Sequence, residues 1–451
     1  MAKSLRSAPM RSIDAASSTN YGRLGIGFVV LTVVTAAEIV RQGAFYRPDS
    51  FVVLVIALGL TLLSLRSTDT QSRVVTAAIA GCAAWWLVAA VIHRRTASFL
   101  PLGASMAGFL ASFLVVRRVD AEHRERAGEV AATIGGVAAA IGLAASAMRW
   151  YPLSMPSQNL WRLATTLTYS DAAGLLIGVS LLIALGLDVH RPLVRLDVSL
   201  CAAGLVATQS RGAVLAVLIG ALLVPWWAFR VARWPLVAGL AGGLLIVGTS
   251  AGSAREPVVF VVVGVLVAAG TLARPSATLV RPKLSRVLLL AGVALALAAA
   301  VGVALHTPVQ RRLDLASTSD RVATWQAAFD QWRSSIWTGV GPDVILRVHT
   351  KQGSYAYFAH DEYLQVAAGA GLVGELLLLA AAGSIAAVVR RRDVLSSCAA
   401  GALVAFAVAA AFDFDWHLAA LGLLGGWAAG LAAPSFDAKA DERDPSLGAS
   451  V

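Results

Sequence analysis

The sequence predicts an all-α protein built as a polytopic bundle of membrane-spanning helices, and both composition and hydropathy support this fold class. Hydrophobic residues make up 58% of the 451 residues and charged residues only 14%. These values lie far outside the range of soluble globular domains. Soluble classes of enzyme and binding protein are therefore excluded, and each apolar run becomes a candidate helix.

About fourteen apolar runs are long enough to approach a bilayer span. Several are short, so we expect 12 to 14 spans in a single transmembrane domain covering residues 23–433. Residues 1–22 are expected to form a cytosolic tail and residues 434–451 a disordered cytosolic tail. The runs are 24–40, 51–65, 74–92, 99–116, 128–147, 171–187, 196–209, 211–229, 234–250, 257–272, 287–305, 363–389, 394–412 and 416–433.

The basic residues that give the net charge of +11 lie in short clusters between the apolar runs, where topology explains them better than nucleic-acid binding does. If the N-terminus is cytosolic, the positive-inside rule places residues 306–362 outside the membrane. Arg94 and Arg95 break this pattern. The inner loops would hold Arg66, Arg73, Arg117, Arg118, Arg124, Arg126, Arg191, Arg195, Arg230, Arg233, Arg274, Arg281, Lys283, Arg286, Arg390, Arg391 and Arg392.

The longest polar interval, residues 318–374, is where we expect chemistry. An amphipathic helix over about 320–336 would place Arg321 on the same stripe as its aromatic residues, where the guanidinium points away from bulk solvent. An inward arginine at a helix start favours an anion such as phosphate. The alternative is an interfacial helix with a snorkelling arginine. The stripe consists of Trp325, Phe329, Trp332 and Ile336.

His360 follows a Gly-Pro turn at 338–342 and stands immediately before the apolar segment that begins near Tyr363. A neutral imidazole there can take a proton from a sugar hydroxyl. The adjacent Asp361 and Glu362 favour the charged ring, whereas a helix N-terminus favours the neutral one, so the sequence leaves its charge state open. The alternative is a histidine that caps the helix.

Other polar residues lie at predicted outer junctions. Arg211 sits between two apolar runs with almost no loop, so it cannot stray far from the bilayer. Asp413 and Asp415 form a D-x-D pair at a turn, a spacing that can hold a metal ion but more often caps a helix or binds an arginine. Cys82, Cys201 and Cys398 each lie inside an apolar run and indicate neither disulfides nor a cysteine metal site. We therefore expect no metal and no cofactor.

Several motifs resemble the O-antigen ligase and Wzy-type O-antigen polymerase family of polytopic membrane glycosyltransferases. They are S-D-R-x-x-x-W, W-T-G-V-G-P, A-H-D-E-Y-L-Q and G-L-V-G within 320–374, with T-x-T-Y-S-D-A-A-G at 166–174 and Q-S-R-G-A at 209–213. The resemblance implies a GT-C-like helical bundle with one large extracytoplasmic loop, 306–362, that contains amphipathic helices.

The resemblance also implies an activity. A glycan would pass from a polyprenyl diphosphate-linked donor to a hydroxyl of a glycan or lipid acceptor, with inversion, on the outer face of the cytoplasmic membrane. Arg211 and Arg321 would hold the diphosphate, and His360 would activate the acceptor. One departure is Asp361, where relatives often have asparagine. The residues expected to contribute to substrate binding are Arg162, Tyr169, Trp325 and Tyr363.

Two other classes remain open at this stage. A flippase for lipid-linked cell-envelope precursors would need basic residues near mid-membrane and no outer histidine. A glycosyltransferase that uses a polyprenyl monophosphate sugar would carry its catalytic acid in the first outer loop, where this chain offers only Asp49, with Glu38 near the end of the span. The sequence does not separate polymerase from ligase.

Overall fold

The computed structural model describes residues 15–65, 68–157, 159–273, 319–342, 348–349, 355–356 and 358–435, and it confirms the all-α fold. The predicted span 287–305 and the start of the outer loop, 306–318, lie outside the described residues. The helices are α1 (Ala15–Val40), α2 (Arg47–Leu65), α3 (Thr70–Ile92), α4 (Thr96–Arg117), α5 (Ala121–Met148), α6 (Ser170–Ala184), α7 (Pro192–Ala207), α8 (Arg211–Ala221), α9 (Trp226–Val231), α10 (Arg233–Gly248), α11 (Pro257–Leu272), α14 (Ser319–Ser334), α15 (Glu362–Val388), α16 (Val394–Ala409) and α17 (Ala419–Ala432).

Short elements join these helices at one end of the bundle. Strands β1 (Ser154–Ser157) and β2 (Leu160–Leu163) form an antiparallel hairpin, as do β3 (Val348–His349) and β4 (Tyr355–Ala356). Three 3₁₀ turns complete the described part of the chain: η1 (Gln42–Ala44), η2 (Thr165–Leu167) and η4 (Asp415–His417).

Every apolar run predicted within the described residues contains a helix. Among these residues, 5 helices are long and apolar enough to cross a membrane, and further apolar helices are shorter. In a bilayer every backbone amide must find an internal partner, so apolar runs of this length form helices. The run 211–229 is not one continuous span as predicted. Helix α8 ends at Ala221, and Pro225, which cannot continue a helix, precedes the short helix α9.

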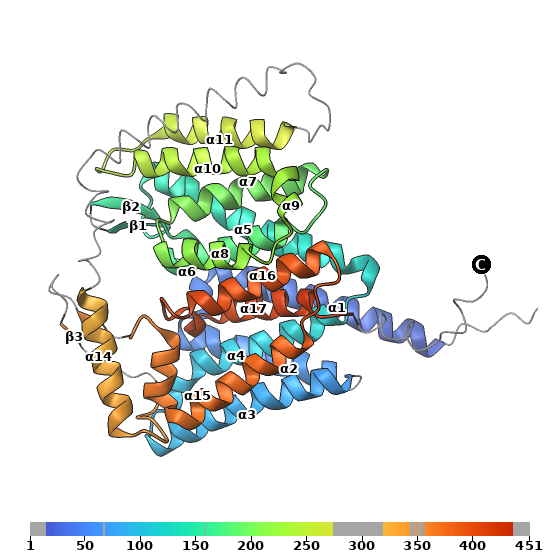
Figure 1. The fold of residues 1–451 in the computed structure, drawn as a ribbon, viewed down its shortest axis with the longest axis vertical. Coiled ribbons are helices and arrows are strands. Elements are labelled where there is room, and N and C mark those ends of the chain that lie inside the picture. Colours follow the sequence, from blue (N-terminus) through green and yellow to red (C-terminus); the bar gives the residue numbers. More distant parts are fainter. Residues whose placement is uncertain are drawn as a thin grey trace, which may run out of the picture.

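The spanning helices lie side by side and roughly parallel (Figure 1). Small residues allow their backbones to approach closely. At Gly426 of α17, an added Cβ would lie 2.0 Å from the carbonyl oxygen of Phe109 in α4, so only glycine fits this crossing. Close backbone approach through small residues is how helices associate in lipid, where burial from water supplies no driving force between them.

The two ends of the bundle differ. One end carries β1–β2, α14 and the α16–α17 turn, and we call it the site end. The turn with Arg94 and Arg95, the exceptions to the charge pattern, also belongs to this end. At the opposite end, Arg117 forms a buried ion pair with Asp69 at 2.9 Å. Other arginines of that end were predicted to face the cytosol: Arg118, Arg124, Arg126, Arg191, Arg195, Arg230, Arg233, Arg390, Arg391 and Arg392.

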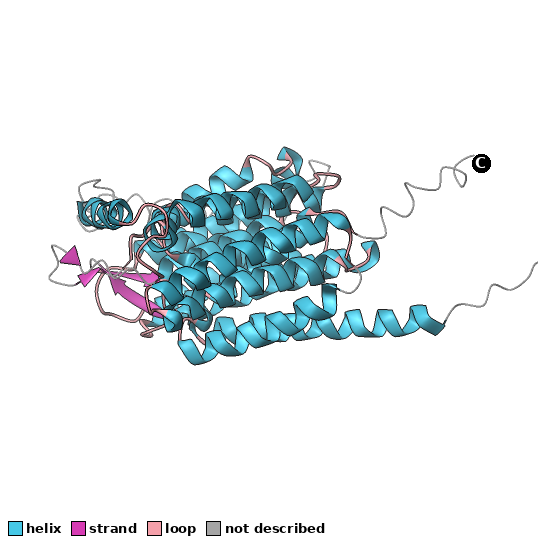
Figure 2. Cartoon of the chain, turned by 90° about the horizontal axis from the view of Figure 1, so that it is seen from below, coloured by secondary structure: helices cyan, strands magenta, loops and turns pink. Residues whose placement is uncertain are grey.

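Helix α14 lies across the site end, at a steep angle to the spanning helices, and is seen end-on in Figure 2. It begins at Ser319 and ends at Ser334, close to the predicted bounds. It packs through small residues, because Thr324 and Ala328 are its buried positions. In the predicted aromatic stripe, Trp325 is 36% and Phe329 43% exposed. The stripe therefore contacts the bundle through Trp332, which packs against the buried Ala328, Ala359 and Ala368, and leaves Trp325 and Phe329 exposed.

Candidate active site

His360 lies directly before α15, but it does not cap the helix. The N-cap is Asp361, whose carboxylate accepts the backbone N–H of Leu364 at 3.0 Å. A carboxylate at this position satisfies an otherwise unpaired amide of the first turn. The interpretation of His360 as a helix cap is therefore wrong, and its side chain is available for another role.

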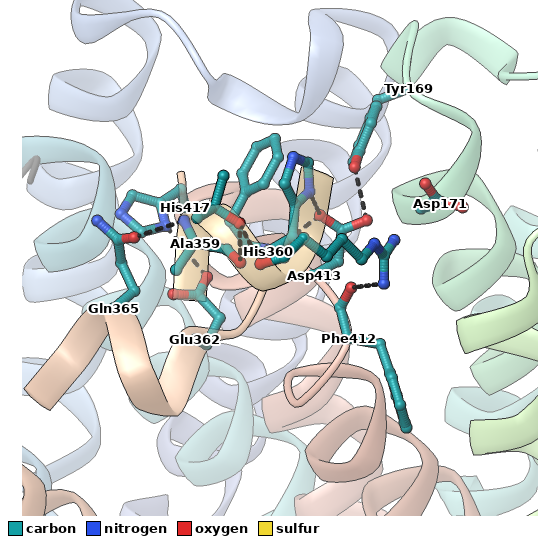
Figure 3. Close-up of polar contacts among 12 residues, drawn as sticks. Tyr169, Asp171, Ala359, His360, Glu362, Gln365, Phe412, Asp413 and His417 are labelled. Carbon is teal, nitrogen blue, oxygen red and sulfur yellow. Dashed lines mark hydrogen bonds and ion pairs between the residues drawn. The ribbon is translucent and has the colours of Figure 1, made fainter. Parts of the chain in front are cut away.

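The partner of His360 comes from the turn between α16 and α17 (Figure 3). His360 Nδ1 lies 3.0 Å from Asp413 Oδ1, and the Asp413 side chain is only 4% exposed. Asp413 also accepts the backbone N–H of Phe414 at 2.9 Å and the hydroxyl of Tyr169 at 2.5 Å. Since an ionised carboxylate only accepts hydrogen bonds, it would hold the proton of a neutral imidazole on Nδ1, and Nε2 would then present its lone pair. The His360 side chain, 29% exposed, is within reach of a substrate.

Tyr169 serves as a fixed donor to this carboxylate. Burial, followed by the nearby charge of Asp413, raises the pKa of the Tyr169 phenol well above its usual range, so it remains protonated. Its ring stacks on Phe414 at 5.2 Å, and Phe358 stacks on Phe414 at 4.3 Å. Aromatic rings therefore pack along one side of the His360–Asp413 pair, where the Phe414 ring lies 5.3 Å from that of His360.

The backbone of His360 is strained. Its φ of 51° lies in the left-handed region, which residues other than glycine enter at a cost of about 1–3 kcal/mol. The preceding residue is held on both sides: Ala359 N–H donates to Gln365 Oε1 at 3.0 Å, and Ala359 O accepts the hydroxyl of Thr324 at 3.3 Å. A strained conformation that neighbouring elements hold in place is characteristic of functional positions.

Arg321 reaches the same turn from α14. Its Nη1 donates to the carbonyl of Phe412 at 3.0 Å, next to Asp413 in the chain. Asp171 and Asp415 also lie within electrostatic reach of its guanidinium. The same helix holds the residue before His360 through Thr324, so α14 links Arg321 to His360. The inward orientation predicted for Arg321 is what the structure shows.

Arg211 begins α8, whose N-cap is Ser210. The next residue, Gly212, faces the same turn, since an added Cβ there would lie 3.0 Å from Phe412 Cβ. Helix α8 therefore starts beside the segment that Arg321 contacts, and both arginines belong to the margin of one site. Arg211 is exposed, as a substrate-binding side chain at this position would need to be.

Among the other predicted binding residues, Arg162 and Tyr363 form hydrogen bonds within the protein. Arg162 pairs with Asp171 at 2.7 Å and donates to the carbonyl of Thr208 at 2.9 Å, so it braces β2 against α6 and α7. The Tyr363 hydroxyl donates to Ala407 O at 2.8 Å. Trp325 lies on α14, part-exposed. Of the predicted binding residues, Tyr169 lies nearest the chemistry, and its bond to Asp413 gives it a supporting position.

The D-x-D pair divides between two environments. The oxygens of Asp413 are engaged by His360, Phe414 and Tyr169, as described above. Asp415 is buried, and burial together with the charges of Asp413 and Asp171 raises the pKa of its carboxyl well above the usual range. This favours its neutral form. Among the described residues, no group of 3 or more His, Cys, Asp or Glu side chains is arranged to hold a metal ion.

Fold and site together define a polytopic helical membrane protein in which a histidine–carboxylate pair and two arginines gather at one end of the bundle. Residues 198–379 match the family model described as O-antigen ligase. This match supports membership of the O-antigen ligase family and confirms the resemblance found in the motifs. The matched domain supports a glycosyl-transfer function at the membrane in general terms. No curated protein matches the chain.

The matched region contains Arg211, Arg321 and His360 but ends before Asp413. From the sequence, the D-x-D pair was interpreted as a metal site, a helix cap or a partner for an arginine, and Asp413 was not identified as the carboxylate partner of His360. Its one signal in the sequence was the presence of Asp413 at a predicted outer turn.

Proposed function

We propose that this protein transfers a glycan from a polyprenyl diphosphate carrier to an acceptor hydroxyl on the outer face of the cytoplasmic membrane. The observation that carries the proposal is the His360–Asp413 pair beside Arg321 at one end of a membrane-spanning bundle. This arrangement supplies a base and a cation for a leaving phosphate. Lipid-linked donors and acceptors would approach through the surrounding bilayer.

In the proposed reaction, Nε2 of His360 takes the proton of the acceptor hydroxyl. The acceptor oxygen attacks the anomeric carbon as the bond from that carbon to the diphosphate oxygen breaks, and a single displacement inverts the configuration. The buried Asp413 carboxylate stabilises the imidazolium that forms and holds the ring in position. A positioned general base contributes about 10²–10⁴ in rate.

Arg321 and Arg211 would receive the charge that develops on the departing diphosphate. Guanidinium groups are permanently charged and match phosphate oxygens with paired donors. Fixed cations of this kind stabilise the transition state without reorganising during the reaction. The contact of Arg321 with Phe412 supports this role, as does the start of α8 at Arg211, because the next residue, Gly212, lies against Phe412 in the turn that carries Asp413.

The other two classes are less well supported. A flippase has no need of a histidine oriented by a buried carboxylate at the bundle end. For a monophosphate-dependent glycosyltransferase, the first outer loop would have to supply a catalytic acid. Asp49 of that loop is in an ion pair with Arg41, and Glu38 is buried close by. These contacts favour a structural role for the two carboxylates.

Purified protein in lipid nanodiscs tests the proposal. Incubation with a polyprenyl diphosphate-linked glycan and an acceptor should yield a covalently extended acceptor and free polyprenyl diphosphate. Movement of intact donor across a bilayer with no covalent product would contradict glycosyl transfer and support the flippase. Depletion in cells then separates the subclasses, because accumulated short lipid-linked units indicate a polymerase and accumulated finished chains a ligase.

The proposed outward orientation of the site end predicts a labelling pattern. Ser253 is exposed in the α10–α11 turn at the site end, and His190 is exposed in the α6–α7 turn at the opposite end. In intact cells a membrane-impermeant thiol reagent should modify Ser253→Cys but not His190→Cys. The native cysteines are buried, so background should be low. The reverse pattern would place the site in the cytosol and rule out the proposed mechanism.

A further inference from the structure

A second histidine–carboxylate pair lies beside the first. In this pair the histidine and the carboxylate come from the opposite segments. Glu362, two residues after His360, has its Oε1 3.1 Å from Nδ1 of His417, four residues after Asp413. Each of the two segments therefore contributes one histidine and one carboxylate. The start of α15 and the α16–α17 turn are joined twice by side chains of opposite type (Figure 3).

The second pair is more deeply buried than the first. The side chains of Glu362 and His417 are 1% and 6% exposed. Glu362 Oε1 also accepts the backbone N–H of Trp416 at 2.7 Å, and the backbone N–H of Glu362 donates to the carbonyl of Ala410 at 2.7 Å. Glu362 thus contacts the turn on both sides of Asp413, at residue 410 and at residues 416–417.

The free-energy cost of taking Glu362 and His417 out of water can exceed the attraction between their side chains. Removing two ionisable groups from water costs free energy, so buried pairs of such groups are weak devices for stability alone. Their best-supported use is to specify one arrangement of the chain. Here the arrangement they specify is the position of the α16–α17 turn relative to His360.

We propose that Glu362 and His417 are positioning residues that set the geometry of the His360–Asp413 pair. The inference rests on the proposed function. Asp413 lies in a short turn, and Phe414 beside it touches His360 only through ring contact at 5.3 Å. With the Glu362 carboxylate removed, the turn would keep its aromatic packing and the backbone bond from Glu362 N–H to Ala410 O, but it would lose the side-chain bonds at Trp416 and His417. A displacement of about 1 Å can lower a rate by about a hundredfold.

Glu362→Gln tests this inference, because glutamine keeps an oxygen for the Trp416 amide but loses the charge. We expect kcat to fall by about tenfold to a hundredfold with the donor KM nearly unchanged. Glu362→Ala should lower kcat more than Glu362→Gln does. His417→Gln, which keeps a hydrogen-bond donor, should retain more activity than His417→Ala. A purely structural role would lower the folded fraction without changing kcat per folded molecule.

A double-mutant cycle shows whether Glu362 acts through Asp413. Adding Glu362→Gln to Asp413→Asn should cost little beyond Asp413→Asn alone, because the geometry that Glu362 protects is already lost. Full additivity, or parental kcat in folded Glu362→Gln and His417→Gln, would overturn the inference. If the variants of Glu362 or of His417 do not fold, the double-mutant cycle between the other residue and Asp413 decides whether the inference holds.

A control is the Arg117–Asp69 ion pair at the opposite end of the bundle, in which Arg117 is buried and Asp69 is half-buried. Asp69→Asn should lower thermal stability while kcat per folded molecule stays parental, which separates loss of a buried ion pair from loss of positioning. Failure of the parental protein to transfer would contradict the proposed function itself. Parental transfer combined with fully active Glu362 and His417 variants would contradict only the positioning role.

Discussion

Replacing His360 with asparagine is expected to abolish glycosyl transfer while the protein folds and binds its donor. Asparagine tolerates the left-handed backbone that His360 adopts at φ 51° better than most residues do. It cannot take a proton from a hydroxyl, so the loss should approach the full contribution of a general base, about 10²–10⁴ in the single-turnover rate. Alanine at this position should lose as much activity but add backbone strain.

The measurement combines donor affinity, single-turnover transfer and thermal stability on purified protein in nanodiscs. Asp361→Asn is the matched control, because asparagine also accepts the amide of Leu364 and preserves the N-cap of α15. That variant should transfer at close to the parental rate. If His360→Asn keeps near-parental transfer, His360 is not the base.

Arg321→Ala is expected to lower transfer by about a hundredfold to a thousandfold and to weaken donor binding, because the guanidinium would contact the diphosphate in both the ground and the transition state. Arg211→Ala should act in the same direction. Lysine at either position should rescue only in part, since its ammonium lacks the paired donors of the guanidinium. This pattern differs from that of His360→Asn, in which donor binding should persist.

Arg333 provides the control for Arg321 on the same helix. It is exposed and lies over the ring of Phe329 at 5.9 Å, away from the α16–α17 turn. Arg333→Ala should therefore leave transfer and donor affinity close to parental values. Equal losses in Arg333→Ala and Arg321→Ala would indicate a general electrostatic attraction for the donor, and a specific diphosphate contact at Arg321 would then be wrong. Donor titration and single-turnover rates distinguish these outcomes.

The fold was largely predictable because the membrane makes it a local property of the sequence. An apolar run in lipid must satisfy its own backbone, so its presence predicts a helix whatever surrounds it. The amphipathic helix that carries Arg321 and the position of His360 before α15 were also predictable from the sequence, since both depend on residues within a few turns of each other. The break between α8 and α9 was overlooked although Pro225 marks it locally.

Partnerships between distant segments were decided by the tertiary structure alone. Asp413 meets His360 across 53 residues and Glu362 meets His417 across 55, because α15, α16 and α17 return their ends to the same side of the bundle. The residues adjacent to His360 in sequence turn elsewhere: Asp361 caps the helix, and Glu362 pairs with the second histidine. Hydropathy determines which segments become helices, but the electrostatic partner of a side chain depends on how helix ends are packed together, and no local pattern encodes that packing.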